Sequence, residues 1–186
     1  MAEAGRRPLI AVFGSSTIGE DDERYREAEE LGRRLAEAGA DVMNGGYGGA
    51  MAACSRGARA AGGHVVGVTV GLFERRGPVN PWVEERVHTG DLFERLRTLT
   101  TRADGFVAVA GSVGTLAEVL LTWNLLMAGA RPPAPLVLLG RPWRDWLEAQ
   151  RAPGLVLPEL FAHVRVADTP AQAVRIVLAG RTRPDA

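Results

Sequence analysis

The stretch GFVAVAGSVGTLAEVLLTWNLLMAG, residues 105–129, contains the pattern that decides the fold. It begins with the short apolar run 105–109, continues through a turn of small residues at 110–115, and ends in a long apolar segment. A short apolar run that ends in a glycine-rich turn is typical of a parallel strand covered on both faces, and the longer segment is typical of a helix. The stretch therefore predicts a strand, a tight turn and a helix.

The same alternation extends along the chain in both directions. Apolar runs predict further strands at residues 8–14, 40–44, 64–70 and 135–140, and helical spacing predicts further helices at 21–39, 50–63, 91–103, 141–150 and 170–179. Residues 71–90, which include Pro78 and Pro81, predict an irregular connection.

Strands that alternate with helices at these spacings predict an α/β fold. We expect a Rossmann-like arrangement of three layers, in which helices cover both faces of a mostly parallel sheet. The length of 186 residues predicts a single domain over residues 1–186. Its core is expected at about 8–140, followed by a helical and strand extension at 141–180.

The composition excludes several functional classes. Basic and acidic residues both number 22, so no field of one sign draws the chain to nucleic acid or to an anionic membrane. All 22 basic residues are arginine, which excludes a Schiff-base lysine and a Walker A loop. His64, His88 and His163 show no metal-like grouping, so neither a metal nor a cofactor is predicted.

The sequence also predicts a soluble, cytoplasmic protein. The N-terminus has no signal-peptide pattern, and no apolar stretch approaches the ~18 residues that span a membrane. The single cysteine, Cys54, is expected to be a small buried residue in a reducing compartment.

Three glycine-rich turns follow predicted strands, at residues 14–19, 44–51 and 110–115. Glycine permits close approach of a ligand to the backbone, and a helix N-terminus offers N–H groups to an anion. None of the turns has the dinucleotide GxGxxG pattern in register. Glycine after a strand often serves only the geometry of the turn, but three such turns in one small domain predict a phosphate-bearing ligand, with a nucleotide as the favoured class.

Thr115 and Glu118 have two interpretations. Thr-x-x-Glu before an apolar run is the capping-box pattern, which explains both residues without catalysis. Alternatively, Glu118 addresses the ribose of a nucleotide whose phosphate lies in the neighbouring turn. Arg95, on the helix before residues 105–109, is spaced to be partly buried, although a lone helical arginine is most often a surface residue.

Residues 45–68 (GGYGGAMAACSRGARAAGGHVVGV) and 94–118 (ERLRTLTTRADGFVAVAGSVGTLAE) resemble the two signature regions of the Lonely Guy (LOG) family. Its motif PGGxGTxxE matches this chain from Ala110 to Glu118, with Ala110 in place of proline and Ser112 in place of glycine. The arginine of the family's HxRK-like motif falls on Arg95, while its histidine and lysine fall on Phe93 and Leu96.

The resemblance implies a Rossmann-like homodimer that hydrolyses a nucleoside 5′-monophosphate to free base and ribose 5-phosphate. It implies that Glu118 and Arg95 are catalytic. The residues expected to bind the phosphate and the nucleotide are Gly111, Ser112, Gly114, Thr115, Gly14, Ser15, Gly46 and Met51.

Two other functional classes stay open. One is a non-catalytic binder or carrier of a nucleotide or of the molybdenum cofactor, and the other is a sensor domain that acts through partners. The apolar helix at 115–129 exceeds what one sheet face needs, which favours a homodimer.

Overall fold

The computed structural model describes residues 6–75, 77–151 and 156–180. Along the chain the elements are β1 (Leu9–Phe13), α1 (Glu23–Glu37), β2 (Asp41–Asn44), α2 (Ala50–Ala60), β3 (Val65–Val70), α3 (Gly71–Glu74), β4 (Glu85–Thr89), α4 (Leu92–Thr101), β5 (Gly105–Val109), α5 (Val113–Met127), β6 (Leu136–Leu139), α6 (Arg141–Arg151), the 3-10 helix η1 (Pro158–His163), β7 (Val164–Ala167) and α7 (Pro170–Ala179). The alternation of strands and helices predicted from the sequence is confirmed; residues 152–155 of the expected C-terminal extension lie outside the described ranges.

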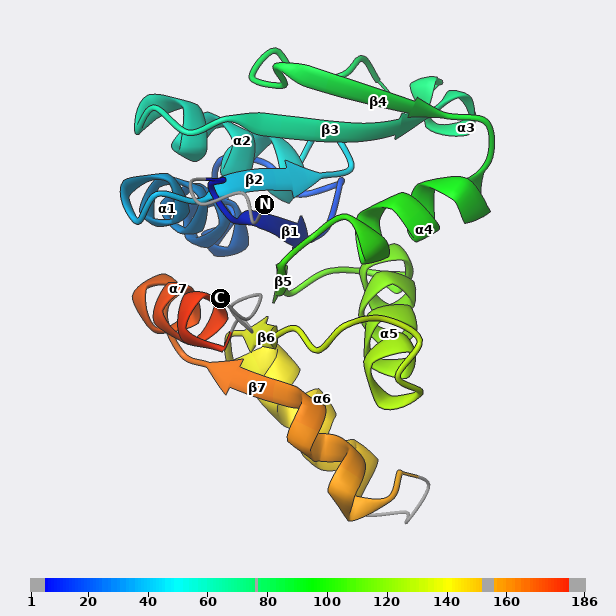
Figure 1. The fold of residues 1–186 in the computed structure, drawn as a ribbon. Coiled ribbons are helices and arrows are strands. Elements are labelled where there is room, and N and C mark those ends of the chain that lie inside the picture. The colour runs from blue at the N-terminus through cyan, green and yellow to red at the C-terminus, as the bar shows by residue number, and fades with distance from the viewer. Residues whose placement is uncertain (1–5, 76, 152–155, 181–186) are drawn as a thin grey trace.

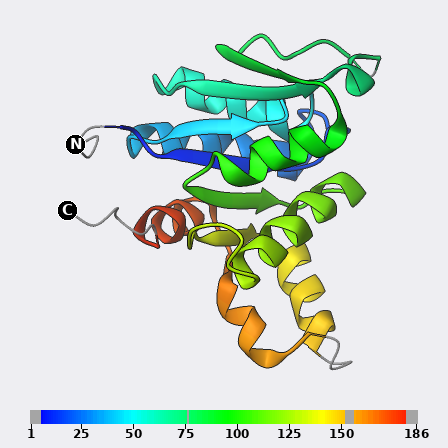
Figure 2. The same ribbon diagram turned by 45° about the vertical axis from the view of Figure 1, so that its right-hand side comes forward.

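The strands form one seven-stranded sheet in the order β4-β3-β2-β1-β5-β6-β7. Every pairing in it is parallel, so the predicted Rossmann-like α/β class is confirmed. Helices cover both faces (Figure 1). Figure 2 shows α4 in front of the strands, with α1 and α2 behind them.

The core consists of two apolar layers, one on each face of the sheet. One layer joins the sheet to α1, α2 and α7. The other joins it to α4, α5 and α6. Strands β1 and β5 are buried along their whole length, because helices cover them on both faces.

The order of strands reverses between β1 and β5, because β1 pairs with β2 on one side and with β5 on the other. Ligands of open parallel sheets bind beside the carboxyl ends of the strands at such a reversal. Gly14 follows β1 and Ala110 follows β5, so both turns lie at this position.

The expectation for residues 71–90 was wrong in part. This segment contains the short helix α3 and the strand β4, which pairs with β3 along the edge of the sheet. Strand β4 has the sequence ERVHT and is mostly exposed, so it lacks the apolar run that marks the buried strands. It is held to the sheet by its pairing with β3, and Glu85 also forms a surface ion pair with Arg102 at 3.0 Å.

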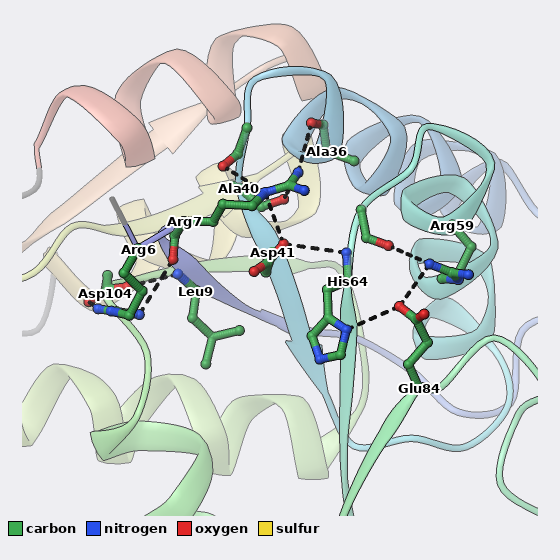
Figure 3. A network of polar contacts seen from close by, with 12 residues as sticks. Arg6, Arg7, Leu9, Ala36, Ala40, Asp41, Arg59, His64, Glu84 and Asp104 are labelled. Atoms are coloured by element: carbon green, nitrogen blue, oxygen red, sulfur yellow. Dashed lines mark hydrogen bonds and ion pairs between the residues drawn. The ribbon is translucent and has the colours of Figure 1, made fainter. Parts of the chain in front are cut away.

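The amino-terminal ends of the strands carry a polar network (Figure 3). Asp104 accepts a hydrogen bond of 2.7 Å from the N–H of Leu9 at the start of β1. Asp41 pairs with Arg7 at 3.1 Å, and His64 lies 3.1 Å from Glu84. These contacts tie together the starts of the strands, at the end of the sheet opposite to the turns that follow β1 and β5.

Helices α1 and α2 approach closely because two glycines lie at their contact. A β-carbon on Gly32 would overlap the carbonyl oxygen of Cys54 and lie 2.8 Å from its carbon. A β-carbon on Gly57 would likewise overlap the carbonyl oxygen of Glu29. Both neighbours are backbone atoms, so relief of the overlap requires the helices to separate.

We therefore expect Gly32→Ala to lower the free energy of unfolding by about 1–3 kcal/mol, although alanine is the better helix former. Urea denaturation measures this difference. The control Glu37→Ala removes an exposed ion pair with Arg33 from the same helix, which changes stability by less than about 1 kcal/mol. A Gly32→Ala protein as stable as the wild type would contradict the close packing of α1 on α2.

Candidate active site

The turns after β1 and β5 meet at Ser15. A β-carbon on Gly111 would overlap Thr115 Oγ1 and lie 2.7 Å from Thr115 Cβ and 3.0 Å from Ser15 N. Ser15 itself is 3% exposed, and its hydroxyl lies 3.0 Å from Thr17 Oγ1. Ser15 is therefore brought next to Gly111 and Thr115, which lie far from it in the sequence.

The turn after β2 joins the same place. The N–H of Ala50 donates to the carbonyl of Ser15 at 2.8 Å, and a β-carbon on Gly49 would lie 2.6 Å from the carbonyl carbon of Ser16. Gly46 has a φ of +79°, which favours glycine, and its N–H donates to Asn44 Oδ1 at 2.8 Å.

The side chain of Asn44 holds the turn after β2 in place through hydrogen bonds. It is fully buried, and its amide donates to the Met51 carbonyl at 3.2 Å and to Ser55 Oγ at 3.0 Å. The sequence reasoning did not assign Asn44 a role. The signal available was a polar residue at the end of a buried strand, directly before two glycines.

Two helices begin beside Ser15, and neither has a side-chain N-cap. Gly49, which has no side chain, precedes α2, and Ser112 precedes α5 without a hydrogen bond from its side chain to the first turn of that helix. The first N–H groups of a helix have no acceptor within the helix and carry a partial positive charge. The N-terminus of α5 is thus suited to a phosphate group, and Gly114 there has open space on its β-carbon side. At α2 the N–H of Ala50 is taken by the Ser15 carbonyl, so only the N–H groups that follow it in the first turn are available to an anion.

The capping-box interpretation of Thr115 and Glu118 is wrong. Helix α5 begins at Val113 with Ser112 at the N-cap position, so Thr115 is already its third residue. Glu118 lies further inside the helix, where its carboxyl cannot reach the N-cap N–H. Thr115 and Glu118 are instead buried, with 2% and 9% of their surfaces exposed.

Arg95 and Glu118 form a buried ion pair between α4 and α5. Arg95 Nη1 lies 3.5 Å from Glu118 Oε1, and the Arg95 side chain is 6% exposed. Arg95 Nε also donates to the carbonyl of Val68 at 2.9 Å, which fixes the guanidinium at the end of β3. The structure thus joins the two residues that the sequence singled out as catalytic candidates.

Burial acts on both charges of this pair. It raises the pKa of Glu118 to about 7, while the positive charge of Arg95 opposes the rise. Burial also lowers the pKa of Arg95, and there the carboxylate of Glu118 opposes the change. Near neutral pH the Glu118 carboxyl therefore exists in both protonation states, as a group that exchanges protons with a substrate requires.

This raised pKa predicts a pH dependence of stability. The folded chain holds the Glu118 proton up to a pH of about 7, whereas the unfolded chain releases it near the ordinary value of 4.5. As the pH rises through this window the unfolded state loses protons first, so the free energy of unfolding falls, by on the order of 3 kcal/mol. Denaturant titrations across this window measure the change.

The matched variant is Glu118→Gln, which cannot ionise and is expected to lack this part of the pH dependence. The same exchange at Glu148, which is 66% exposed on α6, serves as the control and should leave the wild-type curve unchanged. Parallel curves for wild type and Glu118→Gln would contradict the raised pKa.

The remaining residues of interest are Met51, Phe93 and Phe73. Met51 is 8% exposed, and a β-carbon on Gly45 would lie 2.7 Å from its Sδ. Phe93, where the LOG motif has histidine, is 80% exposed on α4. Phe73 lies 5.3 Å from the Arg95 guanidinium, and the sequence reasoning missed it because it belongs to the segment predicted as irregular.

Neither a metal centre nor a membrane span is found in the described part of the chain. Within residues 6–75, 77–151 and 156–180, no group of three or more His, Cys, Asp or Glu side chains is placed to hold a metal ion. No helix in these ranges is both long and apolar enough to cross a membrane.

A sequence model of the SLOG cluster4 family matches residues 7–127, which include all three glycine-rich turns, Arg95 and Glu118. The chain belongs to the SLOG cluster4 family. Its relation to the LOG family, expected from the two signature regions, is confirmed by named relatives.

One relative of this SLOG chain is the cytokinin riboside 5′-monophosphate phosphoribohydrolase of Mycobacterium tuberculosis. It is 32% identical over 155 residues, which are 80% of this chain and 82% of that protein. The rice enzyme of the same name is 35% identical over 127 residues, or 66% of this chain and 52% of the rice protein. The chain thus spans about half the length of the rice relatives it matches.

Solved structures point to a second group within the same fold. The molybdenum cofactor carrier protein of Chlamydomonas reinhardtii superposes with a TM-score of 0.71 at 29% identity. The superposition covers 94% of this SLOG chain and 98% of the carrier protein.

Proposed function

We propose that this chain hydrolyses the N-glycosidic bond of a nucleoside 5′-monophosphate and releases the free base and ribose 5-phosphate. The observation that carries the proposal is the buried Arg95–Glu118 pair beside two helix N-termini without side-chain caps. An anion site and a carboxyl poised near neutrality suit a substrate that has both a phosphate and a scissile sugar bond.

The phosphate is assigned to the turn between β5 and α5. The N–H groups of Gly111, Ser112, Gly114 and Thr115 would bind the phosphate at the positive end of the α5 dipole. Backbone groups are the proposed donors because the chain has no lysine to bind the phosphate. Gly14, Ser15, Gly46 and Met51 complete the nucleotide site from the turns after β1 and β2.

The chemical step assigned to Glu118 is charge stabilisation and proton transfer. The bond between C1′ and the base nitrogen breaks with its electron pair on the base, which takes up a proton. A water oxygen bonds to C1′ and gives up a proton. Ionised Glu118 stabilises the positive charge that develops on the sugar and accepts the proton from water. Arg95 keeps the buried carboxyl ionised for part of the time, because it opposes the effect of burial on the pKa.

A second candidate is a carrier without catalytic activity. The likeness to the Chlamydomonas protein favours it, as do Ala110 and Ser112 at the positions where the LOG motif has proline and glycine. The cargo would be the molybdenum cofactor or a nucleotide, and the phosphate of either suits the same helix N-termini.

Two measurements on the same preparation separate these candidates. The purified protein is incubated with a panel of nucleoside 5′-monophosphates, and free base is quantified by chromatography. Native mass spectrometry then detects any ligand that the protein retained during purification. Base release from at least one nucleotide supports the hydrolase. A retained pterin or nucleotide, without base release from any member of the panel, supports the carrier.

We further propose that α5 forms the contact of a homodimer. Val113, Leu120 and Met127 recur every seven residues along this helix and are 81%, 47% and 41% exposed. Glu118 is the single charged residue of α5, and it is buried. A helix that is apolar on its exposed face is typical of one covered by a partner.

Leu120→Arg is expected to convert the dimer to a monomer, because it places a charge in the centre of this stripe. Sedimentation velocity measures the mass of both proteins. The control Arg141→Glu changes a side chain on α6 that is 89% exposed, and should leave the dimer intact. A wild-type protein that sediments only as a monomer would contradict the assignment.

A further inference from the structure

The Arg95 guanidinium is enclosed by contacts with several different elements of the fold. The carbonyl of Val68 accepts from its Nε at 2.9 Å, and Glu118 Oε1 lies 3.5 Å from its Nη1. On the side of Gly45 there is no room for a side chain, because a β-carbon there would overlap Arg95 Nη2 and lie 3.2 Å from Arg95 Cζ. The ring of Phe73 lies over the guanidinium, with its centroid 5.3 Å from Cζ.

Phe73 is held in this place by Tyr47. The two rings meet edge to face, at 6.1 Å between centroids and an angle of 82°. The Tyr47 hydroxyl donates to the carbonyl of Val70 at 2.7 Å and accepts from the N–H of Val70 at 3.0 Å. The Asn80 side-chain amide donates to the Tyr47 carbonyl at 3.0 Å, so Tyr47 is fixed to the end of β3 and to the following loop.

We propose that Phe73 is a positioning residue, whose ring, held by Tyr47, covers the Arg95 guanidinium and keeps water from the Arg95–Glu118 pair. The role of this pair in catalysis rests on the proposed function, but the contact between the ring and the cation does not. Phe73 has no part in the phosphate site, because it belongs to α3 after β3 rather than to the turns around Ser15.

Removal of the ring has a definite electrostatic consequence. The positive charge of Arg95 lowers the pKa of Glu118, against the effect of burial. Glu118 and the Tyr47 hydroxyl in turn raise the pKa of Arg95, which burial lowers. Water that enters beside the guanidinium reduces the cost of burying either charge. The pKa of Glu118 then falls toward its ordinary value, and the Arg95 Nε–H, now less protected, exchanges faster with solvent.

The test compares Phe73→Leu, which keeps the apolar bulk, with Phe73→Tyr, which keeps the ring. Leu72→Ala is the matched control, because Leu72 is the neighbouring residue of α3 and is 64% exposed. Carbon-13 NMR of glutamate-labelled protein follows the titration of Glu118, whose resonance is assigned by its loss in Glu118→Gln. Nitrogen-15 NMR follows the exchange of the Arg95 Nε–H.

In Phe73→Leu we expect the pKa of Glu118 to fall toward its ordinary value and the Nε–H to exchange about tenfold faster. Phe73→Tyr and Leu72→Ala should match the wild type in both. If the nucleotide assay is active, kcat falls about tenfold in Phe73→Leu while KM changes little, because the phosphate site is intact.

Two results would overturn the proposal. One is a folded Phe73→Leu protein with wild-type titration and exchange, and the other is a Leu72→Ala protein with changes as large as those of Phe73→Leu. Both NMR readouts are independent of turnover. Failure of the proposed hydrolase activity would therefore leave this test valid, and failure of this test would leave the hydrolase assay valid.

Discussion

Glu118→Gln is expected to lower kcat for base release by about a thousandfold or more, because the amide neither accepts a proton nor stabilises a cationic sugar. Nucleotide binding should survive, since we assign the phosphate to the turns around Ser15 and to their backbone N–H groups. Steady-state kinetics of base release and calorimetric titration with ribose 5-phosphate measure the two effects separately.

The control for this substitution is Glu148→Gln, in which the same exchange is made at an exposed acid of α6. Its kinetics should equal those of the wild type. Thermal unfolding establishes that the Glu118→Gln protein is folded, which matters because its glutamine lies beside the buried Arg95. Near-normal turnover in a folded Glu118→Gln protein would show that the carboxyl has no catalytic role.

Gly111→Ala is the second substitution for which we expect a large effect. Its new β-carbon would lie 2.7 Å from Thr115 Cβ and 3.0 Å from Ser15 N. A backbone nitrogen and a β-carbon cannot move aside by rotation of a side chain, so the turns after β1 and β5 must separate. We expect the free energy of unfolding to fall by about 1–3 kcal/mol and the affinity for ribose 5-phosphate to fall by about tenfold or more.

Gly114→Ala provides the matched control for stability. This glycine is in the same segment, but a β-carbon there meets nothing within 4 Å. The Gly114→Ala protein should therefore have a free energy of unfolding equal to that of the wild type or higher by up to about 1 kcal/mol. Equal stability and equal ligand affinity in Gly111→Ala and wild type would contradict the junction of the two turns that the structure describes.

The buried strands were predictable because each has an apolar run that is covered on both faces. Strands β1 and β5 are of this kind. Strand β4 was missed because its sequence, ERVHT, alternates little and faces solvent at the edge of the sheet. The start of α5 was misplaced because Val113 and Gly114 look like turn residues, whereas the helix already includes both.

For the candidate site, the sequence indicated residues of the three glycine-rich turns and the two charged residues of the family motifs, but not how these residues meet. That Arg95 and Glu118 touch depends on the packing of α4 against α5, which spacing along the chain does not reveal. Gly45 and Phe73 matter through contacts across the fold, with Arg95 as their common neighbour. Such long-range neighbours have no signature in one sequence.

The most direct test of the central claim is the product balance of a single nucleotide reaction. The protein is incubated with the nucleoside 5′-monophosphate that it binds most tightly, and free base and ribose 5-phosphate are measured over time by mass spectrometry. The proposed hydrolysis predicts that both products accumulate in equal amounts, at a rate that depends on Glu118. Tight binding of the nucleotide with no formation of either product would contradict it.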